Sequence, residues 1–269
     1  MSRLTTIVAI LFGIGAVAFM VMATTGSLSL LWNPEAILIV IGGSLIAGIA
    51  GSSPLQRKAA WESLRALTSK PADLLALARW WLTVSSTWRR EGVLALQRMI
   101  PTAPSAYAAT IVQLCADGLD SRSIVQLAEQ LSATHARRYE QAIAFFRRLG
   151  GYAPTMGIIG TVIGLISALG NSGTSPATML ERIALSFSAT LWGLVTANFL
   201  WLPIAQRLQE VSNEQRQCDQ LHIEAAQLAA NGATPITVRY HLATLLPPDQ
   251  QSELLQELEI SFTTAVTEE

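Results

Sequence analysis

The chain has 269 residues, with 18 Lys and Arg against 19 Asp and Glu, so its formal net charge is −1. Hydrophobic residues make up 51% and charged residues only 14%, which is too apolar for an ordinary soluble domain. The balanced charge gives no reason to expect nucleic acid as a partner, and two isolated cysteines predict neither a disulfide framework nor a zinc site.

The first long apolar segment runs from Thr5 to about Thr25, and a second follows from Ala36 to about Ser52. Each is close to the roughly 17–25 residues that a membrane helix needs. A cleavable signal peptide is the alternative for the first segment, but only one basic residue precedes it and no Ala-x-Ala cleavage site is clear near its end. We therefore expect residues 1–54 to form an N-terminal transmembrane hairpin.

Residues 55–150 have apolar side chains at helical spacing and no alternating pattern that would indicate a sheet. A turn precedes a helix that begins near Ser121, with Asp120 or Ser121 as its N-cap. Because no strong breaker follows before Gly150, this helix should continue into the membrane region as one long element. We expect residues 55–150 to be a helical cytoplasmic domain.

Two further apolar segments, at about residues 152–169 and 183–205, predict a C-terminal transmembrane hairpin over residues 151–205. The remaining residues, 206–269, should form a cytoplasmic helical tail whose first helix ends at Gly232. The expected fold class is all-α: a polytopic membrane protein with four transmembrane helices and a helical cytoplasmic domain.

Basic residues predict the orientation of these spans. Residues 55–150 hold 13 of the 18 Lys and Arg, whereas the first short link holds none and the second holds only Arg182. Basic residues gather on the cytoplasmic side of membrane proteins. We therefore expect both short links outside, and both chain termini in the cytoplasm.

The two cytoplasmic parts differ in charge. Residues 55–150 carry 13 basic and 7 acidic residues, for a net +6, and residues 206–269 carry 3 basic and 10 acidic, for a net −7. Two explanations remain open. The charges belong to solvated faces, or the two parts pack against each other or bind a charged partner.

The spans themselves lack ionisable side chains. The first, third and fourth contain no Asp, Glu, Lys, Arg or His, and in the second only Glu35 stands at the outer edge. A protein that moves ions through hydrocarbon normally has such a group in the path. Either this chain moves no ions, or another chain supplies the carboxylate. No nucleophile–base constellation or phosphate loop indicates an enzyme, and no cofactor or metal site is expected.

Small residues recur at steps of three and four in the third and fourth spans, which lets another helix approach closely. They are Gly157, Thr161, Gly164 and Ala168 on the third span, and Ser186, Thr190, Gly193 and Ala197 on the fourth. One explanation is helix packing within this chain. The other is a narrow seam for a helix of another chain, with the two threonines as its polar groups.

Two prolines flank these faces. Pro154 is expected at the start of the third span, where its missing N–H has no cost. If the fourth helix continues into the tail, Pro203 lies inside it, leaves the carbonyl of Phe199 without its helical partner and favours a kink. Alternatively, Pro203 simply ends the span.

These segments resemble the MotA family of flagellar stator subunits. The strongest match is Gly150-Gly-Tyr-Ala-Pro154-Thr-Met-Gly157-Ile-Ile-Gly160-Thr161-Val-Ile-Gly164, followed by residues 189–205, 38–43 and 117–118. Related proton-channel proteins of the TolQ and ExbB type share part of this pattern. The N-terminal hairpin and the Arg-Arg-Glu-Gly segment at residues 89–92 favour MotA.

The resemblance implies a pentamer in the bacterial inner membrane, arranged around the single spans of two MotB-type chains. MotB would supply the missing membrane aspartate and anchor the unit to peptidoglycan. Ion passage would turn the pentamer, whose cytoplasmic helices push on the rotor protein FliG. The competing interpretations are a TolQ- or ExbB-like energiser of an outer-membrane process and a scaffold without an ion path.

The resemblance also implies roles for individual residues. The ion path would be lined by Thr161, Thr190, Gly157, Gly164, Gly193 and Ala197, and Pro154 and Pro203 would couple it to the cytoplasmic part. Arg89 or Arg90 would contact the rotor by charge complementarity. Two positions depart from the family: Gln97 replaces a rotor-facing glutamate, and Ala189 replaces a threonine of sodium-driven relatives. The coupling ion is therefore expected to be the proton.

Overall fold

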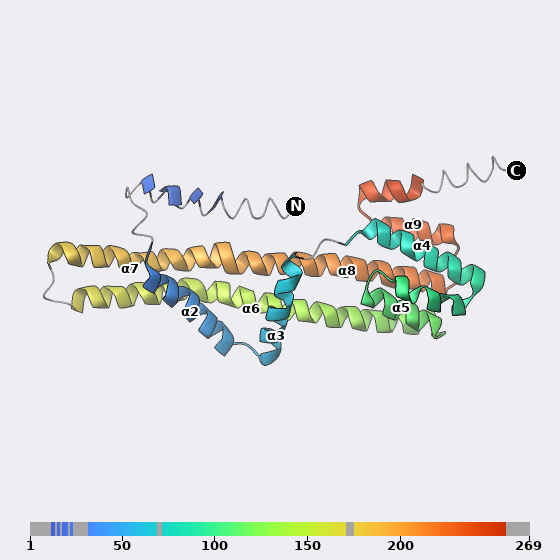
Figure 1. The fold of residues 1–269 in the computed structure, drawn as a ribbon, viewed down its shortest axis with the longest axis horizontal. Coiled ribbons are helices and arrows are strands. Elements are labelled where there is room, and N and C mark those ends of the chain that lie inside the picture. The colour runs from blue at the N-terminus through green and yellow to red at the C-terminus, as the bar shows by residue number, and fades with distance from the viewer. Residues whose placement is uncertain are drawn as a thin grey trace. The chain divides into compact units, whose positions relative to one another are not determined.

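The protein is described here by a computed structural model, shown in Figure 1. The structure describes residues 32–68, 72–170 and 175–256, and before them residues 12–13, 15–16, 18–20 and 22–23. Within these ranges the chain forms helices joined by turns and loops, without a strand, which confirms the expected all-α class. The first predicted span, residues 5–25, lies largely outside the described residues.

The chain divides into two compact units. The first comprises Met1–Thr68 and Arg138–Gln209, and the second comprises Ser69–Arg137 and Glu210–Glu269. Two long helices contribute residues to both units: α6 (Ser121–Gly170) and α8 (Leu202–Ala230). Each unit therefore has its own core, although neither is a continuous stretch of sequence.

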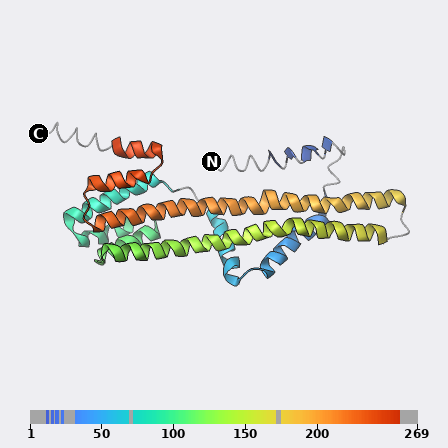
Figure 2. The ribbon, with the colours of Figure 1, turned by 180° about the vertical axis from the view of Figure 1, so that it is seen from behind.

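In the first unit, α6 runs antiparallel to α7 (Pro176–Thr196), and the reverse view in Figure 2 shows the same pair from behind. The apolar helix α2 (Pro34–Ala50) packs against α7. Its N-cap Asn33 accepts a hydrogen bond from the Ala36 N–H at 3.1 Å and donates to Ser188 Oγ at 3.0 Å. The Asn33 side chain thus provides an acceptor for a free N–H group in the first turn of α2 and also links this end of α2 to α7.

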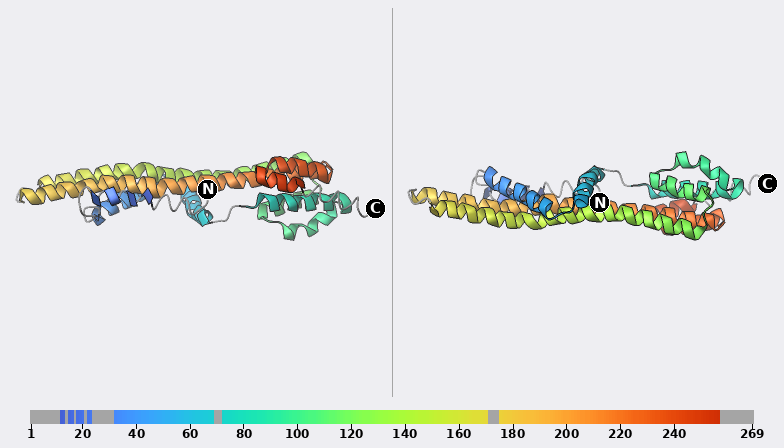
Figure 3. Two further views of the ribbon diagram at one scale, coloured as in Figure 1. Left: turned by 90° about the horizontal axis from the view of Figure 1, so that it is seen from above. Right: turned by 90° about the horizontal axis from the view of Figure 1, so that it is seen from below.

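Helix α2 also lies against α6, on one side of the α6–α7 pair (Figure 3). A Cβ on Gly48 would lie 2.2 Å from the side chain of Leu149, and a Cβ on Gly43 would lie 2.8 Å from the sulfur of Met156. Both distances are shorter than a carbon contact allows. A larger residue at either glycine would therefore require the facing side chain of α6 to shift.

Two arginines satisfy carbonyl groups at the end of α2. Arg57, in α3 (Pro54–Ser63), donates to the carbonyls of Ile49 at 3.2 Å and Ser52 at 2.7 Å. Arg148, from α6, donates to the carbonyl of Gly51. Positive charge is favourable at a helix C-terminus, where carbonyl groups lack helical partners. A 3₁₀ helix, η2 (Leu64–Thr68), follows α3.

Helix α6 contains 50 residues and begins as the sequence predicts, with Asp120 accepting hydrogen bonds from the Ser123 N–H at 3.2 Å and hydroxyl at 2.6 Å. It continues through Gly150 as one element. The expectation that the missing N–H of Pro154 has no cost is wrong, because Pro154 lies inside α6. Its missing N–H leaves the carbonyl of Gly150 without the usual helical donor.

The helical path also continues through Pro203, so this proline lies inside a helix, as the first alternative expected. Helix α7 passes into a π-helical turn, η5 (Ala197–Trp201), and then into α8. A proline ring clashes with the carbonyl four residues before it, here that of Phe199. The wider π turn ends just before Pro203 and accommodates this conflict by local expansion of the helix.

By length and composition, α6 and the continuous helical segment Pro176–Ala230 could each cross a membrane. Helix α2 is a shorter apolar helix. These three elements contain the second, third and fourth predicted spans.

The second unit is built around a conventional apolar core. Its elements are α4 (Leu74–Glu91), the 3₁₀ helices η3 (Val93–Arg98) and η4 (Ile100–Thr102), α5 (Ala106–Ala116) and α9 (Pro235–Thr244), with one end each of α6 and α8 (Figure 3). The largest fully buried side chains include Trp81, Ile111, Ile124, Leu221 and Leu242. Gly232, with a φ of +70°, ends the α8 segment as expected.

A polar pair lies within this core. The indole N–H of Trp81 donates to Nδ1 of His222 at 2.7 Å, and both rings are buried. The ring of Tyr107 stands edge-on to His222 at 5.6 Å, and its hydroxyl donates to the carbonyl of Ala128 at 2.9 Å. Burial disfavours the charged imidazole and lowers the pKa of His222 to about 4.

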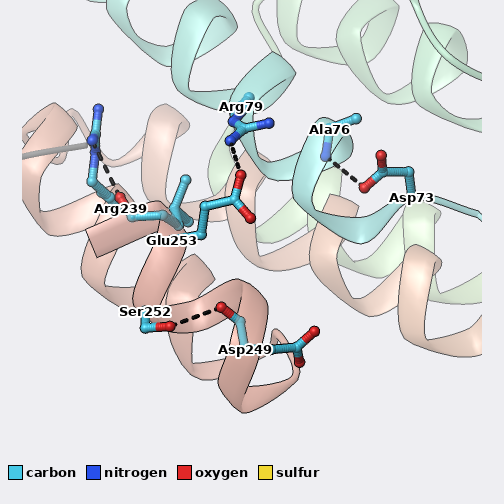
Figure 4. Close-up of polar contacts among 8 residues, drawn as sticks. Asp73, Ala76, Arg79, Arg239, Asp249, Ser252 and Glu253 are labelled. Atoms are coloured by element: carbon cyan, nitrogen blue, oxygen red, sulfur yellow. Dashed lines mark hydrogen bonds and ion pairs between the residues drawn. The ribbon is translucent and has the colours of Figure 1, made fainter. Parts of the chain in front are cut away.

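Polar contacts on the surface of this unit join residues 248–256, which are helical, to α4 and α9 (Figure 4). Arg79 forms an ion pair with Glu253 at 2.7 Å, and Arg239 donates to the carbonyl of Leu254 at 3.3 Å. The N-cap of α4 is Asp73, which accepts from the Ala76 N–H at 3.0 Å. These exposed contacts fix local geometry more than they add stability.

Candidate functional site

The small faces of α6 and α7 lie against each other. A Cβ on Gly157 would lie 2.7 Å from the carbonyl oxygen of Ala189, and a Cβ on Gly193 would lie 2.8 Å from that of Ala153. The two backbones therefore approach more closely than any other residue type would permit. Of the two explanations for these faces, packing within this chain is present in the structure.

Two hydroxyl groups meet in this contact. Thr161 Oγ1 lies 2.6 Å from Thr190 Oγ1, and either oxygen can be the donor. Thr161 Oγ1 also lies 3.1 Å from the carbonyl oxygens of Gly157 and Ser186. A hydroxyl carries one hydrogen and two lone pairs, so Thr161 can donate to only one of these acceptors at a time. The pair can therefore change donor by rotating a hydroxyl, without moving a helix.

We call this contact the threonine seam and define it as Gly157, Thr161, Gly164, Ser186, Thr190 and Gly193. Thr161 and Ser186 are buried, and Thr190 is half-buried. A Cβ on Gly164 would lie 2.3 Å from Ser186 Oγ, which donates to the carbonyl of Arg182 at 2.8 Å. The seam offers hydroxyls and carbonyls to a passing ion or side chain, and no ionisable group of its own.

The other sequence-predicted residues lie at varying distances from the seam. Pro154 borders it, since a Cβ on Gly193 would lie 3.1 Å from the Cα of Pro154. Ala197 is buried at the start of the π turn, in a cluster with Phe146 and Trp201. Pro203 follows the π turn and lies outside the seam.

A cavity of about 610 Å³ lies beside the seam. Sequence reasoning did not predict it. We call it the α2 cavity, because the first turns of α2 form one wall and α6 and α7 form the others. Its lining includes Asn33, Glu35, Gly160, Ser167, Arg182, Ser186 and Ala189. The sequence signal that could have found it is a carboxylate at the edge of one apolar span and serines in two others.

The three residues predicted to contact the rotor lie in the second unit. Arg89, in the last turn of α4, donates to the carbonyl of Gly232 at 2.8 Å and so joins α4 to the turn after α8. Arg90 and Gln97 are exposed. Nearby, Arg98 pairs with Glu91. Arg89 and Arg90 are thus both exposed on this turn, and Arg89 also has a local structural contact.

Comparison with known proteins points in one direction. The model of the MotA/TolQ/ExbB proton channel family matches residues 100–219. Motility protein A of Bacillus subtilis is 28% identical over 248 residues, covering 90% of each chain. The Bacillus subtilis flagellar MotAB stator complex contains a similar fold, with a TM-score of 0.83 and 27% identity over 94% of this chain and 98% of that one. The MotAB structure from C. jejuni gives a TM-score of 0.86 at 22% identity, over 92% of this chain and 97% of that one.

The similarity to Motility protein A covers 90% of each chain, and the range that matches the family model contains the threonine seam. The seam has the properties that the spacing of small residues predicted: glycines at close approach and two facing threonines. The chain is thus similar, over residues 100–219, to the MotA/TolQ/ExbB proton channel family and, over nearly its whole length, to the MotA-type proteins of flagellar stators.

Proposed function

We propose that this stator subunit forms an inner-membrane proton path together with a MotB-type single-span partner, and that proton flow through the path produces torque on the rotor. In this proposal the chain crosses the membrane four times, through residues 5–25, α2, residues 152–169 of α6, and residues 183–205 of the continuous helical path of α7, η5 and α8. Both termini lie in the cytoplasm, as the basic residues of positions 55–150 indicate.

The observation that carries the proposal is the threonine seam. Its only side-chain polar groups are hydroxyls, and the surrounding segments, residues 152–169 and 183–205, contain no ionisable side chain. A carboxylate at this depth must come from another chain if ions are to pass. A single-span partner bearing an aspartate satisfies that need. The partner's carboxylate would be neutral when protonated and charged when it releases the proton inward.

Within this scheme the threonine hydroxyls respond to the state of the partner carboxylate. A deprotonated carboxylate accepts hydrogen bonds, and Thr161 or Thr190 can donate one by leaving its present acceptor. A protonated carboxylate needs an acceptor instead, which either hydroxyl oxygen also provides. The seam can thus form a hydrogen bond with the partner carboxylate in its charged and in its neutral state, and needs no charged group of its own.

Several copies of the chain, five by family resemblance, would surround the partner spans and rotate around them. The interior prolines are the proposed coupling points. Pro154 borders Gly193 of the seam, and Pro203 follows a π turn in the same helical path. Both positions lack a backbone donor, so the helix can bend there at lower cost than elsewhere.

Torque would reach the rotor protein FliG through the exposed end of α4. Arg90 is the stronger candidate contact, because Arg89 already donates to the Gly232 carbonyl. Gln97 replaces the glutamate usual in the family, so this chain presents a more basic surface there. A rotor surface rich in carboxylates fits that charge.

The experiment replaces the hydroxyls by methyl groups of the same size. Thr161→Val and Thr190→Val should each slow proton flux and swimming by about tenfold, since one hydrogen bond to a charged group in a dry site contributes about 1.5 kcal/mol. Thr110→Val, whose exposed hydroxyl donates to the Ala106 carbonyl in α5, is the control and should change neither. Equal, mild effects at all three positions would show that the threonines of the seam only pack the helices together.

The partner requirement separates the stator from its alternatives. In vesicles, flux is expected only when the chain is combined with an aspartate-bearing MotB-type subunit. Flux from the chain alone would contradict the proposal, and no flux with any partner would favour a scaffold. Restored swimming in cells that lack their own stator distinguishes it from a TolQ- or ExbB-like energiser of the outer membrane.

A further inference from the structure

We propose that the α2 cavity is an aqueous antechamber, through which a hydrated monovalent cation reaches the threonine seam from outside the membrane. This inference rests on the proposed function and adds an access route and a charged gatekeeper to it. In the proposed topology the start of α2, the end of α6 and the start of α7 lie at the outer membrane surface, and these three segments form the cavity.

The cavity has the size and lining of a space that holds water. Its volume of about 610 Å³ corresponds to roughly twenty water molecules at about 30 Å³ each. Apolar cavities stay dry, whereas this lining contains the side chains of Asn33, Ser167 and Ser186 and charged groups. Water there would keep its hydrogen bonds, and a cation would keep part of its hydration.

Exposure along the lining shows which end is open. Trp32, Glu35 and Arg182 are exposed, whereas Gly160, Ser186 and Ala189 are buried. The charged residues therefore form the mouth and the small residues the floor. An exposed tryptophan at such a mouth suits the interface between headgroups and water.

The floor touches the seam. Gly160 and Ala189 come directly before Thr161 and Thr190, and a Cβ on Gly160 would lie 2.8 Å from the Cβ of Ala189. Ser186 lines the cavity, and its carbonyl oxygen lies 3.1 Å from Thr161 Oγ1. One layer of small residues thus separates the cavity from the hydroxyl pair, which is the shortest barrier available between helices.

Charge at the mouth favours cations without trapping them. Glu35 supplies a carboxylate, and the last turn of α6, which includes Ser167, presents the negative end of its helix dipole. Arg182 opposes this attraction from the facing wall. A conducting path requires binding that is favourable enough for ions to enter and weak enough for them to leave. Because Glu35 attracts cations and Arg182 repels them, the mouth of the cavity is suited to cations that pass through rather than to cations that stay bound.

Cysteine accessibility tests the wet cavity with two matched pairs. All four positions are exposed in the single chain, but Ser167 and Ile163 line the cavity, whereas their neighbours Ile166 and Val162 do not. The native cysteines, Cys115 and Cys218, are buried in the second unit. Each cysteine variant is treated in intact, swimming cells with a charged, membrane-impermeant methanethiosulfonate.

Only a thiolate in water reacts with this reagent, so Ser167→Cys and Ile163→Cys should be labelled at least about tenfold faster than Ile166→Cys and Val162→Cys. Similar, slow labelling of all four would show that lipid or protein fills the cavity, and would overturn the proposal. Similar, fast labelling of all four would also overturn it, because water would then reach faces outside the cavity equally.

The gatekeeper is tested by Glu35→Gln, with Glu35→Asp as the conservative variant. Loss of the carboxylate should raise the external cation concentration at half-maximal flux by about tenfold at low salt and leave the maximal flux unchanged. Glu35→Asp should restore the original value. An unchanged half-saturation in Glu35→Gln would contradict the role of Glu35. If the native chain and its partner conduct normally while these results fail, only the antechamber is refuted, whereas absent flux in the native pair refutes the proposed function itself.

Discussion

The threonine seam and the core of the second unit hold helices together in opposite ways. In the seam, backbones approach through Gly157 and Gly193, and two hydroxyls bond across the contact. In the second unit, large side chains such as Trp81 and Leu221 fill the space between helices. The comparison separates a contact suited to lipid, where apolar burial gives no drive between helices, from one suited to water.

The difference also distinguishes where each region tolerates change. Where the two backbones meet, the seam has glycines with no side chain to remove, so it is sensitive to added atoms there. The core of the second unit is sensitive to lost atoms, because a large side chain leaves a cavity behind. A seam built from hydroxyls and peptide groups can also rearrange its hydrogen bonds, whereas a packed core resists rearrangement. The proposed ion path therefore lies in the more adaptable of the two contacts.

The largest expected effect is on the second unit. Trp81→Ala should destabilise it by about 3–5 kcal/mol, because the variant leaves a cavity and removes the donor to buried His222. Hydrogen exchange of α5 amides in the complete protein measures this loss. Trp61→Ala in α3, where the indole is 76% exposed, is the control and should have little effect. Equal protection in both variants would contradict a core centred on Trp81.

The seam should respond to the opposite kind of change. Gly157→Ala adds one methyl group 2.7 Å from the Ala189 carbonyl, and should cost about 1–3 kcal/mol and abolish swimming. Gly151→Ala, six residues earlier in α6, is the matched control, since its Cβ meets nothing within 4 Å. Alanine favours helix, so this control should be neutral or slightly stabilising. Normal swimming with Gly157→Ala would show that the helices can separate without loss of function.

Acid should separate the two regions as well. His222 has a pKa of about 4 in the folded protein, below its ordinary value of about 6.5, because burial disfavours the charged ring. The unfolded chain therefore binds a proton more readily, and stability is lost as the pH falls from about 6.5 towards 4. At pH 5 the second unit should be less stable by about 2 kcal/mol than at pH 7.5.

The seam has no titratable side chain, so its packing should not share this dependence. Amide exchange in α5 and in α7, compared at the two pH values, measures the difference in one protein. His222→Asn keeps an acceptor for the indole N–H of Trp81 but cannot titrate. The variant should therefore lose the part of the dependence of stability on pH that comes from His222. If the stability of His222→Asn depends on pH as strongly as that of the native protein, other groups cause the acid sensitivity.

The sequence predicted the elements whose signals are local. The N-cap Asp120, the continuous helix after it and the end of α8 at Gly232 all follow from side chains within a few residues of the boundary. The small-residue spacing also brought the seam residues onto facing surfaces, because period and helix geometry are linked.

The features that the sequence did not predict depend on partners distant in the chain. The sequence placed Pro154 at the start of a span without predicting how closely it approaches Gly193 of α7, because that contact joins two segments distant in the chain. Pro203 predicts a conflict with the carbonyl of Phe199, but the sequence did not predict the π turn that relieves it. The α2 cavity arises where three helices fail to fill the space between them, and no single segment encodes it.

The smallest expected effect is that of replacing sodium by potassium. Sodium is held by several oxygens in place of its water, whereas a proton can be carried by one carboxylate with nearby water. The seam supplies Thr161 and Thr190, but Ala189, where the resemblance places another threonine in sodium-driven relatives, is buried at the floor of the α2 cavity and offers no hydroxyl. Cells that carry only this stator should therefore swim at unchanged speed when potassium replaces sodium at fixed pH, and should stop when a protonophore is added. Swimming that disappears with sodium yet survives the protonophore would show that oxygens outside this hydroxyl set complete a sodium site, and that the proton assignment is wrong.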